Sequence, residues 1–111
     1  MIRVTINYDR EGFVSSFTVK GHSGYDEAGK DIVCAAVSAV VQTAVLGLTD
    51  LAGIRPDYHQ EHGNLSCTLP SEMTDQDRLL TDTILRTMVI GLKSIEYGYK
   101  SFISIEEKEG K

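Results

Sequence analysis

DIVCAAVSAVVQTAVLGLTDLAG, residues 31–53, contains the longest apolar stretch of the chain, and the other elements have to be arranged around it. The stretch is rich in Ala, Val and Leu, and it ends at Gly53, which is followed by Pro56, so it predicts a helix that begins near Asp31. The apolar surface of this helix is nearly continuous, and such a helix is usually covered on more than one side. In a chain of 111 residues we expect a second subunit to supply the extra cover, which predicts a homodimer.

Before this helix, apolar and polar residues alternate with the period of a strand that has one buried face. The pattern runs through residues 2–8 and again through 13–19, and the polar sequence DREG at 9–12 connects the two runs. We expect these strands to form an antiparallel hairpin.

After the helix, two more strands are predicted near residues 57–62 and 65–69, joined by a tight turn at Gly63-Asn64. Thr74 then offers a cap for a helix that ends at Gly98. Its apolar residues have the three- and four-residue spacing of a single buried stripe: Leu80, Ile84, Met88, Leu92 and Ile95. A last strand is expected over 101–105, with residues 106–109 as a solvated charged tail.

The predicted order is ββαββαβ, which is an α+β fold with a mainly antiparallel sheet covered by two helices. Composition agrees with one soluble domain over residues 1–111, because the chain is 41% hydrophobic and 24% charged and is too short for two cores. No secretory leader is visible, and Ser38, Gln42 and Thr43 interrupt the apolar stretch, so we expect a protein that is neither exported nor membrane-spanning.

Charge and cysteine content narrow the partners and the compartment. Two cysteines in a domain rich in aliphatic residues need not form a disulfide, which favours the reducing cytoplasm. A net charge of -5 without a Lys/Arg cluster argues against direct binding of nucleic acid and suits a basic protein partner.

The residues with chemical potential gather at 21–38, where three glycines, Gly21, Gly24 and Gly29, make the connection permissive in backbone conformation. Asp31 is a good N-cap, which places Cys34 at the third helical position. There the helix dipole and the free backbone N–H groups favour the thiolate, which is the reactive form.

His22 can reach Cys34, because a loop of about ten residues that doubles back from a strand to a helix brings its ends together. A thiol beside an imidazole is the nucleophile-and-base pair of thiol proteases, and amides at the start of the helix could hold an oxyanion. Ser38 lies one turn after Cys34 on the same face, where it could contact His22 or substrate, or simply bond back to the helix.

Each residue also has a structural interpretation. A cysteine in an Ala/Val-rich helix is more often a packed side chain, and Asp31 alone would be only a cap. Two other classes of function therefore stay open: a non-catalytic dimeric module that grips a peptide with residues 21–30, and a redox-sensing thiol protein. A sensor usually has a resolving thiol nearby, whereas Cys67 alternates with Leu65 and Leu69 and is expected to face the core.

Metal and cofactor chemistry is not predicted. His59 and His62 are three residues apart on an expected strand and so would point to opposite faces, which argues against a shared ion. The glycines at 21–29 do not match the spacing of a nucleotide-binding loop.

The run GHSGYDEAGKDIVCAAVSA, residues 21–39, resembles the signature of the ribosomal-processing cysteine protease Prp family, with Ser23 where alanine is the more usual residue. The resemblance in length and order of elements extends over the whole chain. It implies an α+β homodimer, a cytoplasmic cysteine endopeptidase of ribosome biogenesis that removes an N-terminal extension from a large-subunit ribosomal protein and cuts after an aromatic residue.

The resemblance also implies roles for individual residues. His22 and Cys34 would form the catalytic dyad, with Asp31 and Ser38 as supporting residues. Gly21, Gly24 and Gly29 would let the substrate loop move aside, and no cofactor would be needed.

Overall fold

A computed structural model describes residues 1–22 and 31–110 of the chain. Its elements follow the predicted order ββαββαβ. They are β1 (Ile2–Tyr8), β2 (Val14–Lys20), α1 (Ile32–Asp50), β3 (Asp57–Glu61), β4 (Asn64–Thr68), α2 (Asp75–Gly98) and β5 (Ile103–Lys108).

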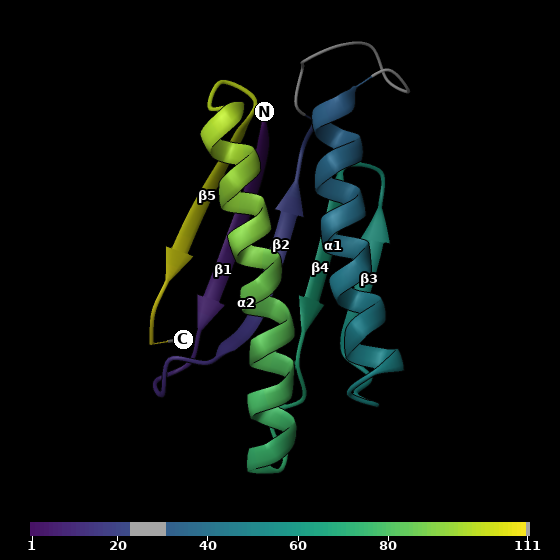
Figure 1. Cartoon of the computed structure of the whole chain (residues 1–111), viewed down its shortest axis with the longest axis vertical. Helices are drawn as coiled ribbons and strands as arrows, with labels where there is room; N and C mark the ends of the chain where they lie inside the picture. Colours follow the sequence, from purple (N-terminus) through teal and green to yellow (C-terminus); the bar gives the residue numbers. More distant parts are fainter. Residues whose placement is uncertain (23–30, 111) are drawn as a thin grey trace.

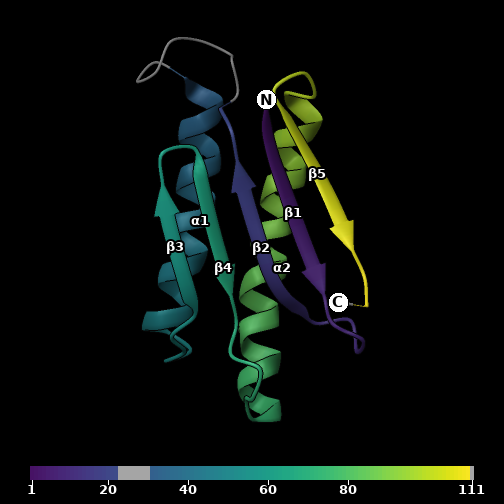
Figure 2. The same ribbon diagram turned by 180° about the vertical axis from the view of Figure 1, so that it is seen from behind.

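The strands form a five-stranded sheet in the order β3-β4-β2-β1-β5. All neighbouring pairs are antiparallel except β1 and β5, which run parallel. Figure 1 shows α1 and α2 side by side in front of the sheet, and Figure 2 shows the same sheet from its uncovered face. The predicted α+β fold with a mainly antiparallel sheet and two covering helices is confirmed.

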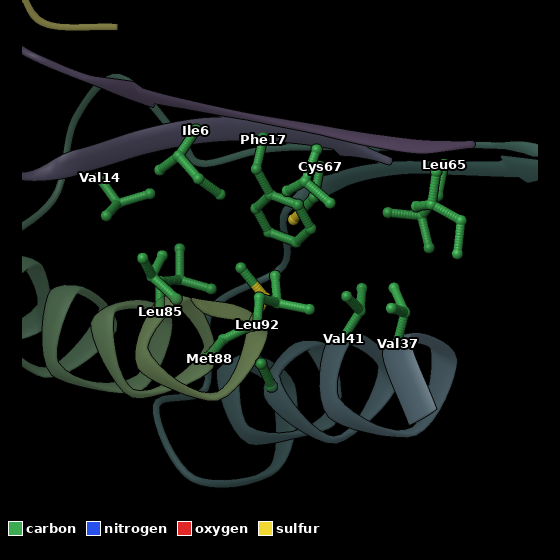
Figure 3. Close-up of a cluster of buried hydrophobic side chains, with 14 of the residues drawn as sticks. Ile6, Val14, Phe17, Val37, Val41, Leu65, Cys67, Leu85, Met88 and Leu92 are labelled. Carbon is green, nitrogen blue, oxygen red and sulfur yellow. The ribbon is translucent and has the colours of Figure 1, made fainter. Parts of the chain in front are cut away.

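The core lies between the sheet and the two helices. Phe17 on β2 is fully buried at its centre, opposite Ile6 on one side and Cys67 on the other in the strand register. Figure 3 shows these side chains directed towards Val41 of α1 and Met88 of α2. Burying one such large apolar side chain is worth about 1.5–3 kcal/mol, so this layer holds the helices on the sheet.

Helix α1 has 19 residues and a mean hydropathy of 2.0, which by length and composition alone would allow it to cross a membrane. Its buried residues recur at three- and four-residue intervals and belong to the core described above: Val33, Val37, Val41, Ala44 and Leu48. A helix in the core of a globular domain can have the same length and hydropathy, so these two properties do not distinguish it from a membrane-spanning helix. On the opposite side, Ile32 and Leu46 remain 52% and 59% exposed.

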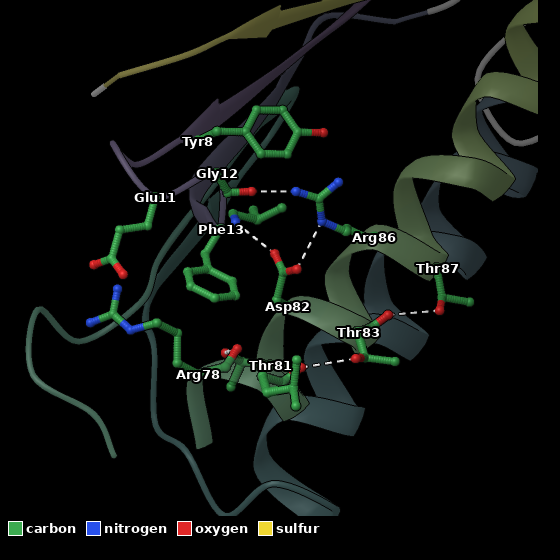
Figure 4. Close-up of polar contacts among 12 residues, drawn as sticks. Tyr8, Glu11, Gly12, Phe13, Arg78, Thr81, Asp82, Thr83, Arg86 and Thr87 are labelled. Atoms are coloured by element: carbon green, nitrogen blue, oxygen red, sulfur yellow. Dashed lines mark hydrogen bonds and ion pairs between the residues drawn. The ribbon is translucent and has the colours of Figure 1, made fainter. Parts of the chain in front are cut away.

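The buried stripe of α2 differs from the predicted one. Leu80 is 40% exposed, whereas Leu85 is fully buried and Asp82 is also buried. The cause is a polar anchor: the Asp82 carboxylate accepts a hydrogen bond from the backbone N–H of Val14 and one from the Nε of Arg86, both at 2.8 Å (Figure 4). The bond to Val14 holds Asp82 against β2, which leaves Leu80 on the exposed side of α2, whereas the bond to Arg86 lies within the helix.

The charged residues 106–109 were expected to be a solvated tail; residues 106–108 are exposed, as expected, but they do not form a tail. They belong to β5, where Glu107 pairs with Ile6 in the parallel register. The Glu107 carboxylate accepts a hydrogen bond from the hydroxyl of Tyr8 and pairs with the Lys93 ammonium. Burial, followed by the bond to Glu107, raises the pKa of Tyr8 to about 12, while Lys93 and then Tyr8 lower the pKa of Glu107.

Candidate active site

The first turn of α1 presents Cys34. Asp31 has the extended backbone of an N-cap, and its Oδ1 accepts hydrogen bonds from the N–H groups of Val33 and Cys34, both at 3.0 Å. The predicted cap is confirmed, and Cys34 is the third residue of the helix. The N–H groups of Val33 and Cys34 are therefore already hydrogen-bonded to the cap, and the expectation that amides at the start of the helix hold an oxyanion stays a prediction.

His22 lies two residues beyond the end of β2. The intervening Gly21 has a φ of +89°, and a Cβ at this position would lie 2.5 Å from the carbonyl oxygen of Met1. Glycine is required on both counts, because other residues avoid this backbone region and the space beside it is filled. The chain can therefore leave the sheet and place His22 on the exposed rim.

Cys34 and His22 both border a cavity of about 250 Å³. His22, Cys34 and Ser38 all line it. Its apolar lining comes from the sheet and from the inner face of α1: Ile2, Val19, Val37, Val41 and Leu65. The structure thus brings three of the predicted side chains to one space, while Asp31 acts at the helix cap beside it.

Two predicted loop glycines, Gly24 and Gly29, lie outside the described residues, as does Ser23. Gly21 is described and lines the same cavity as His22.

Sequence reasoning missed several lining residues. Gln42 follows Cys34 and Ser38 at four-residue intervals on α1, and this spacing alone would have placed it on their face. Gln60, Glu61, Gly63 and Asn64 come from the β3–β4 hairpin. No local signal reveals them, because they reach the site only through the pairing of β4 with β2, a strand more than forty positions earlier.

The second cysteine is separate from this site. Cys67 is 1% exposed and belongs to the core, as its alternation with leucines predicted. Burial raises the pKa of its thiol to about 11.

The other histidines do not lie at the cavity. His59 is on β3, where its Nε2 pairs with Asp57 at 2.9 Å, and both side chains are exposed. His62 lies in the β3–β4 turn rather than on the strand to which the sequence assigned it. Over residues 1–22 and 31–110, no three His, Cys, Asp or Glu side chains come close enough to hold a metal ion.

The geometry assembles a thiol on the first turn of a helix, an imidazole and a hydroxyl around a mostly apolar cavity. The thiol and the imidazole are the nucleophile and the base that thiol hydrolases use to attack a carbonyl carbon. The class that the fold and site define is a small α+β cysteine hydrolase.

Comparison with known proteins narrows this class. The family model described as cysteine protease Prp matches residues 1–104. The ribosomal processing cysteine protease Prp of Bacillus subtilis is 32% identical over 107 residues, which cover 95% of this chain and 96% of that protein. Its counterpart in Staphylococcus aureus is 34% identical over 108 residues, covering 97% and 100%.

A solved structure gives the same result. The crystal structure of the essential ribosomal processing protease Prp from S. aureus, in complex with a covalently linked product peptide, superposes with a TM-score of 0.88 at 33% identity, covering 97% of this chain and 100% of that one. The chain belongs to the Prp family and is a cysteine protease.

Proposed function

We propose that this protease is an endopeptidase that removes the N-terminal extension of a large-subunit ribosomal protein during ribosome assembly, with a dyad of Cys34 and His22. The observation that supports it most directly is that these two residues line one cavity although they come from different elements. The curated relatives are ribosomal processing proteases, which supports a ribosomal protein as substrate.

In the proposed reaction His22 takes the proton of the Cys34 thiol, and the sulfur attacks the carbonyl carbon of the scissile peptide bond. The carbon–nitrogen bond then breaks as the imidazolium donates its proton to the leaving amine, which leaves a thioester on Cys34. A water molecule, deprotonated by His22, attacks that thioester, and the departing sulfur recovers the proton. The two steps together consume one water for each peptide bond cleaved.

Asp31 and Ser38 have supporting parts in this proposal. Asp31 fixes the first turn of α1 and with it the direction in which Cys34 enters the cavity. Ser38 borders the cavity one turn further along the same helix, where its hydroxyl can meet the substrate or His22.

The walls of the cavity fit the proposed substrate. Its aliphatic lining suits an aromatic side chain next to the scissile bond, and the net charge of -5 favours encounter with a basic ribosomal protein. A cytoplasmic location follows from this substrate.

The proposed homodimer rests on apolar side chains left in solvent. Ile32 and Leu46 of α1 are more than half exposed, and on α2 Ile90 and Tyr97 are 70% and 80% exposed. Side chains of this kind favour a second subunit as cover. A monomeric mass in sedimentation at micromolar concentration would contradict the dimer.

The decisive experiment mixes the purified protein with the N-terminally extended ribosomal protein and identifies the products by mass spectrometry. Cys34→Ala should abolish cleavage, and Cys34→Ser should nearly do so, because a hydroxyl is a poor nucleophile at neutral pH. Cys67→Ala is the matched control, since it removes the other thiol from the core and should retain cleavage.

If the Cys34→Ala variant cleaved the substrate at the wild-type rate, the proposed dyad would be overturned. Tight binding of the extension without cleavage by the wild-type protein would instead support a peptide-binding module. A redox-sensing role would need a resolving thiol, and Cys67 is buried in the core.

A further inference from the structure

The turn between β3 and β4 lies against His22, and the proposed mechanism gives it no role. Glu61 and Asn64 are paired across the hairpin, so the turn consists of His62 and Gly63 rather than the predicted Gly63-Asn64. Gly63 has a φ of +70°, a conformation that glycine adopts without strain. It also lines the cavity, together with His22 and Cys34.

The backbone of this turn is bonded to the chain directly before His22. The N–H of Gly21 donates a hydrogen bond of 2.8 Å to the carbonyl oxygen of Gly63. This bond extends the ladder between β2 and β4, in which Lys20 is paired with Asn64. The hairpin therefore fixes the backbone from which the imidazole projects.

The missing side chain of Gly63 provides the room for that imidazole. A Cβ at Gly63 would lie 3.2 Å from Nε2 of His22, 3.8 Å from Cδ2 and 3.9 Å from Cε1. Three neighbouring ring atoms thus face the turn, and Nε2 is nearest. Since His22 is exposed, burial does not hold the ring, and the bare backbone of Gly63 forms a wall beside it.

We propose that Gly63 is a positioning residue for His22, a role that rests on the proposed function of His22 as the proton-transfer partner of Cys34. Any side chain at residue 63 displaces the imidazole by a few tenths of an ångström. Proton transfer requires hydrogen-bond reach, and small displacements at such a contact are costly. The apolar walls that receive the substrate are unchanged, so the loss falls on kcat rather than on KM.

The test compares substitutions at two glycines. Gly63→Ala and Gly63→Asn both add a Cβ beside His22, and asparagine tolerates the positive φ better than alanine does. Gly53→Ala and Gly53→Asn are the matched controls, because Gly53 has a φ of +67° but a Cβ there would meet nothing within 4 Å. Each substitution should lower the denaturant midpoint by a similar amount at Gly63 and at Gly53, because the two φ angles are similar. In contrast, kcat should fall on the order of 10-fold only in the Gly63 variants, with KM nearly unchanged.

A second arm adds Gly63→Ala to His22→Ala. If Gly63 acts through His22, the double variant should cleave at the same residual rate as His22→Ala alone. A further 10-fold fall would show that Gly63 acts independently of the imidazole and would overturn the inference, as would a wild-type kcat in Gly63→Asn. Full activity of His22→Ala would overturn the proposed dyad as well, so the two failures are distinguishable.

Discussion

The same residue type occurs in two contrasting environments at Cys34 and Cys67. Cys34 is partly exposed on the first turn of α1 and lines the cavity, whereas Cys67 is enclosed by the sheet and the helices. A thiol reacts as thiolate and only where a reagent can reach it. The two cysteines should therefore differ sharply in chemistry.

Iodoacetamide at pH 8 should label Cys34 and leave Cys67 unmodified, since burial holds the pKa of Cys67 near 11 and also blocks access. Peptide mapping by mass spectrometry measures both sites, and concentrated urea should make both react. Labelling of Cys67 in the folded protein at the rate of Cys34 would contradict this assignment.

Raising the pH from about 9 to 11 should destabilise the fold, because the unfolded chain then loses the Cys67 proton before the folded chain does.

At the scale of the element, the N-terminus of α1 combines a structural task with the site. The Asp31 carboxylate satisfies two N–H groups of the first turn, and Cys34 is one of the residues bonded. Thr74 performs the corresponding task for α2, accepting from the N–H of Asp77 at 3.1 Å, and it does not border the cavity. The two caps can thus be compared directly.

Asp31→Ala and Thr74→Ala should each lower the free energy of unfolding by about 0.5–2 kcal/mol, because each removes one cap. Only Asp31→Ala should also reduce cleavage, since its helix turn carries Cys34. Urea unfolding and peptide cleavage assays measure the two effects. Asp31→Asn keeps a cap acceptor and should recover most of the stability. Equal losses of activity in both alanine variants would show that general loosening, not the cap at the site, is responsible.

The sequence predicted the existence and type of each element that has a clear local pattern. It did not predict how a helix is rotated about its axis or which distant elements it contacts. The alternation in β1 and the cap-to-glycine signals of α1 depend on neighbouring residues, so they are readable in sequence. The stripe of α2 was predicted one position off at Leu80, because Asp82 bonds to the distant N–H of Val14. In the same way Gly63 reaches His22 only through strand pairing, which periodicity does not specify.

At the scale of the whole molecule, β5 and α2 are tied to β1 by polar contacts as well as by the core. Glu107 on β5 contacts both Tyr8 of β1 and Lys93 of α2. Glu106, its neighbour, pairs with Lys108 at 3.2 Å on the exposed surface of the same strand. Glu107 therefore connects three elements, whereas the ion pair of Glu106 stays within β5, so the two residues can be compared by substitution.

Glu107→Gln should lower the free energy of unfolding at pH 7 by up to about 1 kcal/mol, whereas Glu106→Gln should change it by less than about 0.5 kcal/mol. The folded chain lowers the pKa of Glu107 below 4.5, so its contribution is present above that pH and is lost as the pH falls through the lowered value. The difference between wild type and Glu107→Gln should accordingly shrink in acid. Denaturant unfolding at pH 7 and in acid measures it, and a constant difference would contradict this account.

The parallel pairing of β1 with β5 has a consequence for the order of synthesis. β1 is made well before one of its two partners, residues 103–108, which follow it by about a hundred positions in the chain. A nascent chain that has reached only Tyr99 therefore carries β1 as an open edge, with backbone groups ready to pair with another chain. The sheet is complete only once residues 103–108 have been made and have paired with β1, so a chain interrupted before them would leave this edge open to another strand.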